Sequence, residues 1–236
     1  MKKFIVENSF WELFPEAKIG VIVFKDIDNT IKDSNRYKEM LINAEKQALK
    51  HLPKEDFSSN DVIRVWREAF QKFKTKKGAR SSVEALLKRA HKGDQIGTIN
   101  PLVDIYNSIS LKYALPCGGE DIDTFVGNII LTKANGDEPF ITLGSEESAP
   151  PNKDEIVYKD DAGAICRCWN WRESVRTMLI EQTKNAFLCI ELVDANRVND
   201  LKKALGELAE LVEENLGGVY QILVLDYVNQ EIIIEQ

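Results

Sequence analysis

The feature of this sequence that most constrains its fold is the order of its segments with helical or strand-like apolar spacing. Apolar side chains recur with helical spacing in four segments between residues 34 and 113, and from residue 127 onward short β-branched runs alternate with turn residues. Helices and strands that are segregated along a chain are typical of α+β proteins. We therefore expect an α+β fold, formed by one domain over residues 1–236, with mixed or antiparallel sheets flanked by helices.

Local signals place the individual helices. Helices are expected over residues 34–51, 61–73, 81–93, 101–113 and 198–216. Asp33, Ser34 or Asn35 can cap the first of these. Ser81 and Glu84 have the spacing of a capping box, which predicts that they begin the third.

Turn chemistry separates the expected strands. These cover residues 19–24, 127–132, 140–143, 155–158, 164–168, 186–192, 219–225 and 231–234. Dipeptides such as Asn-Gly between them predict hairpins. The segment Pro116–Asp123 has two adjacent glycines and is interpreted as a tight turn, where the backbone can approach a ligand closely.

Composition excludes several classes of protein. The chain is 44% hydrophobic and 29% charged, close to the globular average, which argues against disordered, collagen-like and repeat proteins. No apolar run reaches the roughly 18 residues of a membrane helix. Glu7, Glu12 and Glu16 interrupt the only segment that resembles a signal peptide. We expect a cytoplasmic protein without a membrane partner.

Cysteine and histidine residues give no sign of a metal site. The four cysteines include a Cys-x-Cys pair, Cys166 and Cys168, which lacks the spacing of zinc knuckles. On one strand both thiols would face the same side and fill apolar space. His51 and His91, the two histidines, lie in basic helical stretches. We expect neither a metal nor a cofactor.

Charge is distributed unevenly. The net charge is -7, yet residues 64–92 contain ten Lys or Arg and two Glu. A basic block on an acidic body can hold a phosphate backbone, and aromatic residues at 66, 70 and 73 are interleaved with it. The same aromatics have helix-core spacing, and basic runs are usually solvated helix faces, so both interpretations stay open.

Two polar clusters are unusual in residue type. Asp104, Asn107 and Ser110 share one helix face, although Asp and Asn are unfavourable inside helices. They would bind either a ligand or a neighbouring loop. The run Arg167–Ser174 contains two Trp, two Arg, an Asn and a Glu directly after a strand, which is typical of recognition surfaces. No P-loop, GxGxxG, HExxH or Ser-His-Asp pattern occurs in the sequence.

Taken in order, these runs resemble the freestanding B3/4 domain family. The resemblance is carried by the segments 80–89, 99–111, 115–123, 154–158 and 166–172, together with Gly127 and Leu143-Gly144, and it covers roughly residues 15–225, with a helical part at about 30–93. The family is similar to the editing module of the phenylalanyl-tRNA synthetase β-subunit, which hydrolyses tyrosine wrongly attached to tRNA(Phe). The resemblance implies a trans-acting deacylase whose partner is mischarged aminoacyl-tRNA.

The resemblance also implies residue roles. Asn107 aligns with the Asn of the synthetase's Thr-Asn pair, Tyr106 takes the place of the Thr, and Gly118 takes the place of the pocket histidine. The synthetase's glycine-rich turn corresponds to the segment 169–171. Asn107, Glu173 and Gly118 are then expected to be catalytic, as polar contact, as water-orienting or amine-binding carboxylate, and as oxyanion donor.

Two further sets of residues are expected to bind the substrate and the tRNA. The substrate-binding set is Tyr106, Ser110, Gly119, Asp121, Trp169, Asn170, Trp171, Arg172 and Thr183. The tRNA-binding set is Lys74, Lys76, Lys77, Arg80, Lys88 and Arg89. Two other functions remain open, a non-catalytic module that binds tRNA or an amino acid, and a small-molecule hydrolase or isomerase.

Overall fold

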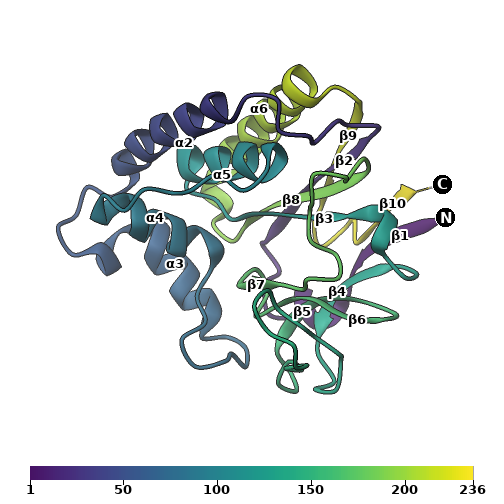
Figure 1. Cartoon of the computed structure of the whole chain (residues 1–236). Helices are drawn as coiled ribbons and strands as arrows, with labels where there is room; N and C mark the ends of the chain where they lie inside the picture. Colours follow the sequence, from purple (N-terminus) through teal and green to yellow (C-terminus); the bar gives the residue numbers. More distant parts are fainter. Residues whose placement is uncertain (236) are drawn as a thin grey trace.

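The strands of the computed structural model, which describes residues 1–235, form two sheets (Figure 1). The four-stranded sheet is antiparallel, with the order β3 (Cys117–Asp121), β8 (Ala186–Leu192), β2 (Lys18–Lys25) and β9 (Val219–Leu225). The six-stranded sheet has the order β10 (Glu231–Glu235), β1 (Lys2–Val6), β4 (Ile129–Lys133), β5 (Ile156–Asp160), β6 (Gly163–Arg167) and β7 (Arg172–Glu173). It is mixed, because β1 and β4 run parallel. The α+β fold with mixed and antiparallel sheets is confirmed.

Six α-helices accompany these sheets. They are α1 (Asn8–Trp11), α2 (Ser34–Ala48), α3 (Asp61–Phe70), α4 (Ser82–Lys92), α5 (Pro101–Tyr113) and α6 (Val198–Leu216), and short 3₁₀ turns cover Leu49–His51, Phe57–Ser59, Ile122–Thr124 and Ala195–Arg197. In Figure 1 the helices α2, α5 and α6 lie together above the four-stranded sheet, and α3 and α4 form a separate pair at one side.

The inner strands β2 and β8 of the four-stranded sheet are buried on both faces, whereas the edge strand β9 is largely exposed. Ile22 on β2 and Leu188 and Ile190 on β8 pack against α5 and α6. Val21 on β2 and Phe187 on β8 point the other way, into a core shared with the six-stranded sheet, α1, α3 and α4. This alternation is the period-2 pattern of a strand, and it explains why β8 is buried along its whole length and apolar except at Glu191.

The predicted helix caps are largely confirmed. The Asp33 side chain accepts from the amides of Asn35 and Arg36, and Ser81 accepts from the amide of Glu84. The expected capping box is only half formed, because Glu84 makes an ion pair with Arg67, with 2.7 Å between Oε1 and Nη2. The helix expected to end at residue 73 ends at Phe70.

Three expectations about the β-rich region are wrong. Residues 140–143 form no strand, because their backbone groups bond to scattered partners, such as the Ser148 hydroxyl for the Phe140 amide and the Val175 amide for the Ile141 carbonyl. Pro116–Asp123 contains strand β3 rather than a tight turn. Cys168 lies beyond β6 with a φ of 47°, so it does not share the face of Cys166.

The sequence also left three elements unidentified. Strand β1 pairs with both β4 and β10, and α1 follows it directly. The two-residue strand β7 pairs with the end of β6. Strand β1 depends on pairing partners that are far away in the chain, and β7 depends on a partner across a turn. A local sequence pattern contains neither partner. No helix in residues 1–235 is long and apolar enough to cross a bilayer.

Candidate functional site

A cavity of about 300 Å³ lies between the edge of the four-stranded sheet, α5, the start of α4 and the turn that leaves β6. Strand β8 forms its floor, with Phe187, Cys189 and Glu191 on the face opposite to Leu188 and Ile190. A volume of this size suits an amino-acid-sized group rather than a macromolecule.

The turn after β6 forms the wall of the cavity, and a buried ion pair fixes it. The Arg167 guanidinium donates twice to the Glu155 carboxylate, at 2.9 Å each, and the Cys168 amide donates to the same carboxylate at 2.9 Å. Cys168 and Trp169 both have positive φ, 47° and 64°. This backbone reversal sends residues 169–173 along the cavity.

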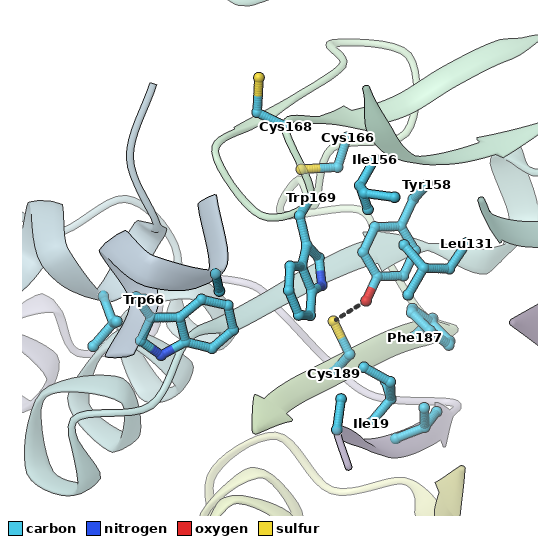
Figure 2. Close-up of a cluster of buried hydrophobic side chains, with 14 of the residues drawn as sticks. Ile19, Trp66, Leu131, Ile156, Tyr158, Cys166, Cys168, Trp169, Phe187 and Cys189 are labelled. Atoms are coloured by element: carbon cyan, nitrogen blue, oxygen red, sulfur yellow. Dashed lines mark hydrogen bonds between the residues drawn. The ribbon is translucent and has the colours of Figure 1, made fainter. Parts of the chain in front are cut away.

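Trp169 joins the wall to the core. Its ring lies 5.0 Å from the rings of Phe10 and Trp66 and 4.7 Å from that of Phe14, measured between centroids. Figure 2 shows Trp169 between Trp66 and Tyr158, beside Cys189. The side chain is fully buried, so one residue supports the cavity and connects α1 and α3 to the sheets.

Three glutamates line the cavity. Burial raises the pKa of Glu173 to about 7, although the backbone amide of Gly119 opposes this shift. Burial likewise raises the pKa of Glu191 to about 7. Burial also raises the pKa of Glu120 well above its ordinary value, and the negative charge of Glu173 raises it further. Within residues 1–235, the only basic side chain among the residues lining the cavity is the exposed Arg172.

Glu191 is held by neutral donors. The Tyr158 hydroxyl lies 2.5 Å from Oε1, and the Asn170 side-chain amide donates to Oε2. The same hydroxyl is 3.9 Å from the Cys189 sulfur, as the dashed line in Figure 2 marks. Asn170 also accepts from the Ser82 amide, which ties the cavity wall to the start of α4.

The polar face expected on α5 divides between two roles. Asn107 lines the cavity, as does Tyr106. Asp104 accepts from the Ile99 amide, and the Ser110 hydroxyl donates to the Leu115 carbonyl at 2.6 Å. Both proposed interpretations therefore apply, to different residues: Asn107 faces the cavity and the other two stabilise neighbouring loops.

Most of the expected site residues meet in one place. The structure brings together at the cavity Tyr106, Asn107, Gly118, Gly119, Trp169, Asn170, Trp171, Arg172 and Glu173. It does not bring Ser110, Asp121 or Thr183 there. Asp121 accepts from the Thr183 hydroxyl at 2.7 Å and caps the following 3₁₀ turn, so these two residues form a structural pair.

The two glycines of β3 have different environments. The Glu191 amide donates to the Pro116 carbonyl, and in an antiparallel ladder the next hydrogen-bonded pair is then Gly118 with Cys189. The Gly118 amide is thus turned into the sheet, which corrects its expected role as an oxyanion donor. The Gly119 amide faces the outer edge of the sheet and the Glu173 carboxylate. A side chain at 119 would meet Leu188 at 2.1 Å, so glycine is required there.

A basic groove adjoins the cavity. Arg80, Lys88, Arg89 and Lys92 line it, and it shares Ser82, Ala85, Trp171 and Arg172 with the cavity. Lys76 lies 6.0 Å over the Trp171 ring, and Lys74 and Lys77 are exposed nearby in sequence without lining the groove. Trp66 and Phe70 are buried, so the core interpretation of the interleaved aromatics is correct for them.

Several cavity residues escaped the sequence analysis, namely Glu120, Glu191, Tyr158, Cys117, Cys166 and Cys189. A usable signal existed for Glu191, since it is the single charged residue within the otherwise apolar run of β8. Neither histidine lines the cavity: the His51 ring hydrogen-bonds with the Lys112 carbonyl, and the His91 ring packs against Phe57 in a tilted arrangement. No group of three or more His, Cys, Asp or Glu is placed to hold a metal within residues 1–235.

Stability is expected to decrease as the pH rises from 5 to 8. The native pKa of Glu191 is about 7 against an ordinary 4.5, so between these values the folded state holds a proton that the unfolded state has lost. The resulting stabilisation is complete below about pH 4.5 and is lost above pH 7, with an upper bound of roughly 3 kcal/mol. Urea midpoints of wild type and Glu191→Gln test this. The variant should show the flatter pH dependence, and equal slopes would contradict the assignment.

Comparisons with known proteins agree on one family. Residues 65–215 match the B3/4 domain. A phenylalanine–tRNA ligase beta subunit from Leifsonia xyli subsp. xyli is 33% identical over 70 residues, and one from Psychrobacter arcticus is 38% identical over 66 residues. These matches cover 30% and 28% of this chain and 8% of each relative, so the similar segment is a small part of those proteins.

One solved structure is similar over most of the chain. An N-terminal fragment of the phenylalanyl-tRNA synthetase beta-subunit from Pyrococcus horikoshii superimposes with a TM-score of 0.49 at 12% identity. The superposition covers 94% of this chain and 53% of that chain.

Proposed function

Because this chain belongs to the B3/4 domain family, we propose that it hydrolyses the ester of mischarged aminoacyl-tRNA in trans. Segments of this chain are similar to beta subunits of phenylalanine–tRNA ligases, enzymes that join phenylalanine to tRNA. The partner of this chain would then be an aminoacylated tRNA.

One observation carries the proposal: an acidic cavity of amino-acid size opens on a basic groove. An aminoacyl-tRNA end has the matching order of charges, with an ammonium at the amino acid and phosphates beyond the ribose. Three carboxylates would face the amino acid, and the groove with Arg80, Lys88, Arg89 and Lys92 would face the phosphates. Trp171 and Arg172 lie between these regions, where the terminal ribose and adenine would be.

The cavity can supply what ester hydrolysis needs. Glu173, with a pKa of about 7, suits a general base at neutral pH. As a water oxygen attacks the ester carbonyl carbon, Glu173 takes the water proton and the carbonyl oxygen becomes an oxyanion. The intermediate then expels the ribose oxygen, which receives that proton. The Asn107 side-chain amide would bind the oxyanion, and the Gly119 amide would hold the Glu173 carboxylate in position.

Aromatic walls would set the choice of amino acid. Phe187, Trp169 and Trp171 line the cavity. The resemblance to the synthetase module implies that Tyr106 and Gly118 take the places of a Thr and a His. Bulky walls and different polar groups favour a side chain that is smaller than tyrosine or of another shape.

A deacylation panel tests the proposal. Purified protein is mixed with correctly charged and mischarged aminoacyl-tRNAs, and the release of radiolabelled amino acid is followed over time. We expect hydrolysis of at least one mischarged pair and sparing of its correctly charged counterpart. Tight tRNA binding without hydrolysis across the panel would instead support the non-catalytic binding module.

Removing positive charge from the basic groove is expected to lower the affinity for tRNA and to make that affinity less dependent on salt concentration. In Lys88→Ala/Lys92→Ala two cations are lost from the groove, so the slope of log affinity against log salt should fall by roughly 1.5. Filter binding between low and moderate salt measures this.

A matched control removes the same charge elsewhere. Lys202 and Lys203 are exposed on α6, outside the groove, and Lys202→Ala/Lys203→Ala should keep the wild-type slope. Equal slopes in both double variants would place the tRNA on another surface. Salt-independent binding in the wild type would favour a small-molecule enzyme.

A further inference from the structure

One carboxylate oxygen of the cavity has no hydrogen-bond partner among residues 1–235, and its residue has no role in the chemistry above. Glu120 is 6% exposed, and its Oε2 has no hydrogen-bond partner within residues 1–235. It differs in this from Glu191, which accepts from Tyr158 and Asn170. A buried carboxylate oxygen without a donor is costly, which points to a group that arrives from outside.

The position of Glu120 on β3 directs it at the reacting region. Glu120 and Gly118 are two residues apart and share one face of the strand. A Cβ at Gly118 would lie 3.8 Å from Glu173 Oε1, so this face borders the Glu173 carboxylate. The Glu120 carboxylate therefore lies beside Glu173, the expected general base.

The surroundings of Glu120 favour a cation. Apart from Arg172, the titratable groups that line the cavity beside Glu120 are acidic or neutral, namely Tyr106 on α5, Cys117 on β3, Tyr158 on β5, Cys166 on β6, Glu173 on β7, and Cys189 and Glu191 on β8. The nearby Arg176 is held by Asp160 through two hydrogen bonds, of 2.7 and 2.9 Å. Arg172 is exposed at the mouth and stacks on Trp171, 5.0 Å from its centroid.

We propose that Glu120 binds the free α-ammonium of the substrate, so that the cavity takes α-aminoacyl groups and rejects neutral acyl groups of the same shape. This inference rests on the proposed function, since the substrate is an aminoacyl ester. The ammonium replaces the proton that Glu120 and Glu173 hold in the empty cavity. Its arrival therefore also leaves Glu173 ionised, ready to accept a proton from water.

Binding of stable analogues tests the inference without hydrolysis. The probes are adenosines that carry alanyl, leucyl or phenylalanyl through an amide at the ribose, and their isosteres in which a hydroxyl replaces the α-amine. Calorimetry in buffers of different ionisation enthalpy gives affinity and proton release together. At pH 7 we expect the best amine probe to bind roughly 10- to 100-fold more tightly than its hydroxyl isostere. It should also release up to about one proton per site.

Glu120→Gln provides the second arm. The substitution keeps shape and removes charge, so the preference for the amine should fall to about twofold or less while the hydroxyl isostere binds as before. Glu181→Gln removes an exposed acid outside the cavity and should behave as wild type. Circular dichroism confirms that each variant is folded.

The outcomes separate the inference from the proposed function. Amine-selective binding with proton release, but no deacylation, would keep the ammonium site and reject the deacylase. Deacylation with equal binding of amine and hydroxyl probes, or without effect of Glu120→Gln, would reject the ammonium site alone. Failure of every amine probe to bind at millimolar concentration would also overturn the inference.

Discussion

Replacing Glu173 by glutamine is expected to lower the rate constant of deacylation by roughly 10²- to 10⁴-fold. Glutamine has nearly the same shape, so it can fill the same place beside Gly119, but it cannot take a proton from the attacking water. Because Glu173 would act on the reacting water rather than on the tRNA, the affinity for aminoacyl-tRNA should stay within about twofold. Single-turnover deacylation of the mischarged tRNA identified in the panel measures the rate constant directly.

The pH profile distinguishes a base from a structural residue. The pKa of Glu173 is about 7, and the base must be ionised, so the wild-type rate should rise through neutral pH and level off above it. A bound ammonium would shift this rise to lower pH. The residual activity of Glu173→Gln should lack the rise. Glu181→Gln serves as the control for loss of one acid. Full activity of Glu173→Gln would remove this residue from the mechanism.

Replacing Trp169 by alanine is expected to lower the free energy of unfolding by about 3–5 kcal/mol. Its ring packs against Phe10, Phe14 and Trp66, which come from α1, the segment after it and α3. Removing it leaves a void at the point where these helices meet the sheets, and the surrounding rings are held by their own contacts. The effect would be large for a domain whose total stability is about 5–15 kcal/mol.

Urea unfolding followed by far-ultraviolet circular dichroism measures this loss. Trp171 is the matched control, since it is a tryptophan of the same cavity wall that is only half-buried. Trp171→Ala should cost clearly less stability than Trp169→Ala. Trp169→Phe should recover part of the loss, because a ring remains. A change below about 1 kcal/mol for Trp169→Ala would mean that the wall and the helices are not coupled through this side chain.

Local sequence patterns were sufficient to predict the helices and strands whose signals lie within the segment itself. The helix at 198–216 and the strands at 186–192 and 219–225 agree with the structure at both ends, because apolar periodicity and terminal glycines are properties of the segment itself. Strands β1 and β3 were missed for the opposite reason. Lys2–Val6 pairs with residues more than 120 positions away, and the glycines of Cys117–Asp121 resemble a turn until β8 supplies a partner.

The candidate site could be predicted in part. Residue types that are unusual for their element, such as Asn107 within a helix and the Trp-Asn-Trp-Arg-Glu run after a strand, indicated six of the residues that line the cavity. The glycine pair at 118 and 119 and the family resemblance, which pointed to Tyr106, added three more. The same reasoning included Ser110, Asp121 and Thr183, whose polar groups bond to one another or to the backbone. Residue type alone does not distinguish a polar side chain that faces a cavity from one that satisfies a loop.

The sequence by itself determined the α+β class, most helices, the basic block and the resemblance to the B3/4 family, since each depends on residues that are close in the chain. Only the tertiary structure placed Glu120, Glu173 and Glu191 around one cavity and joined that cavity to the basic groove. These carboxylates come from three strands of two sheets. Their raised pKa values arise from burial, which depends on how the sheets and helices pack.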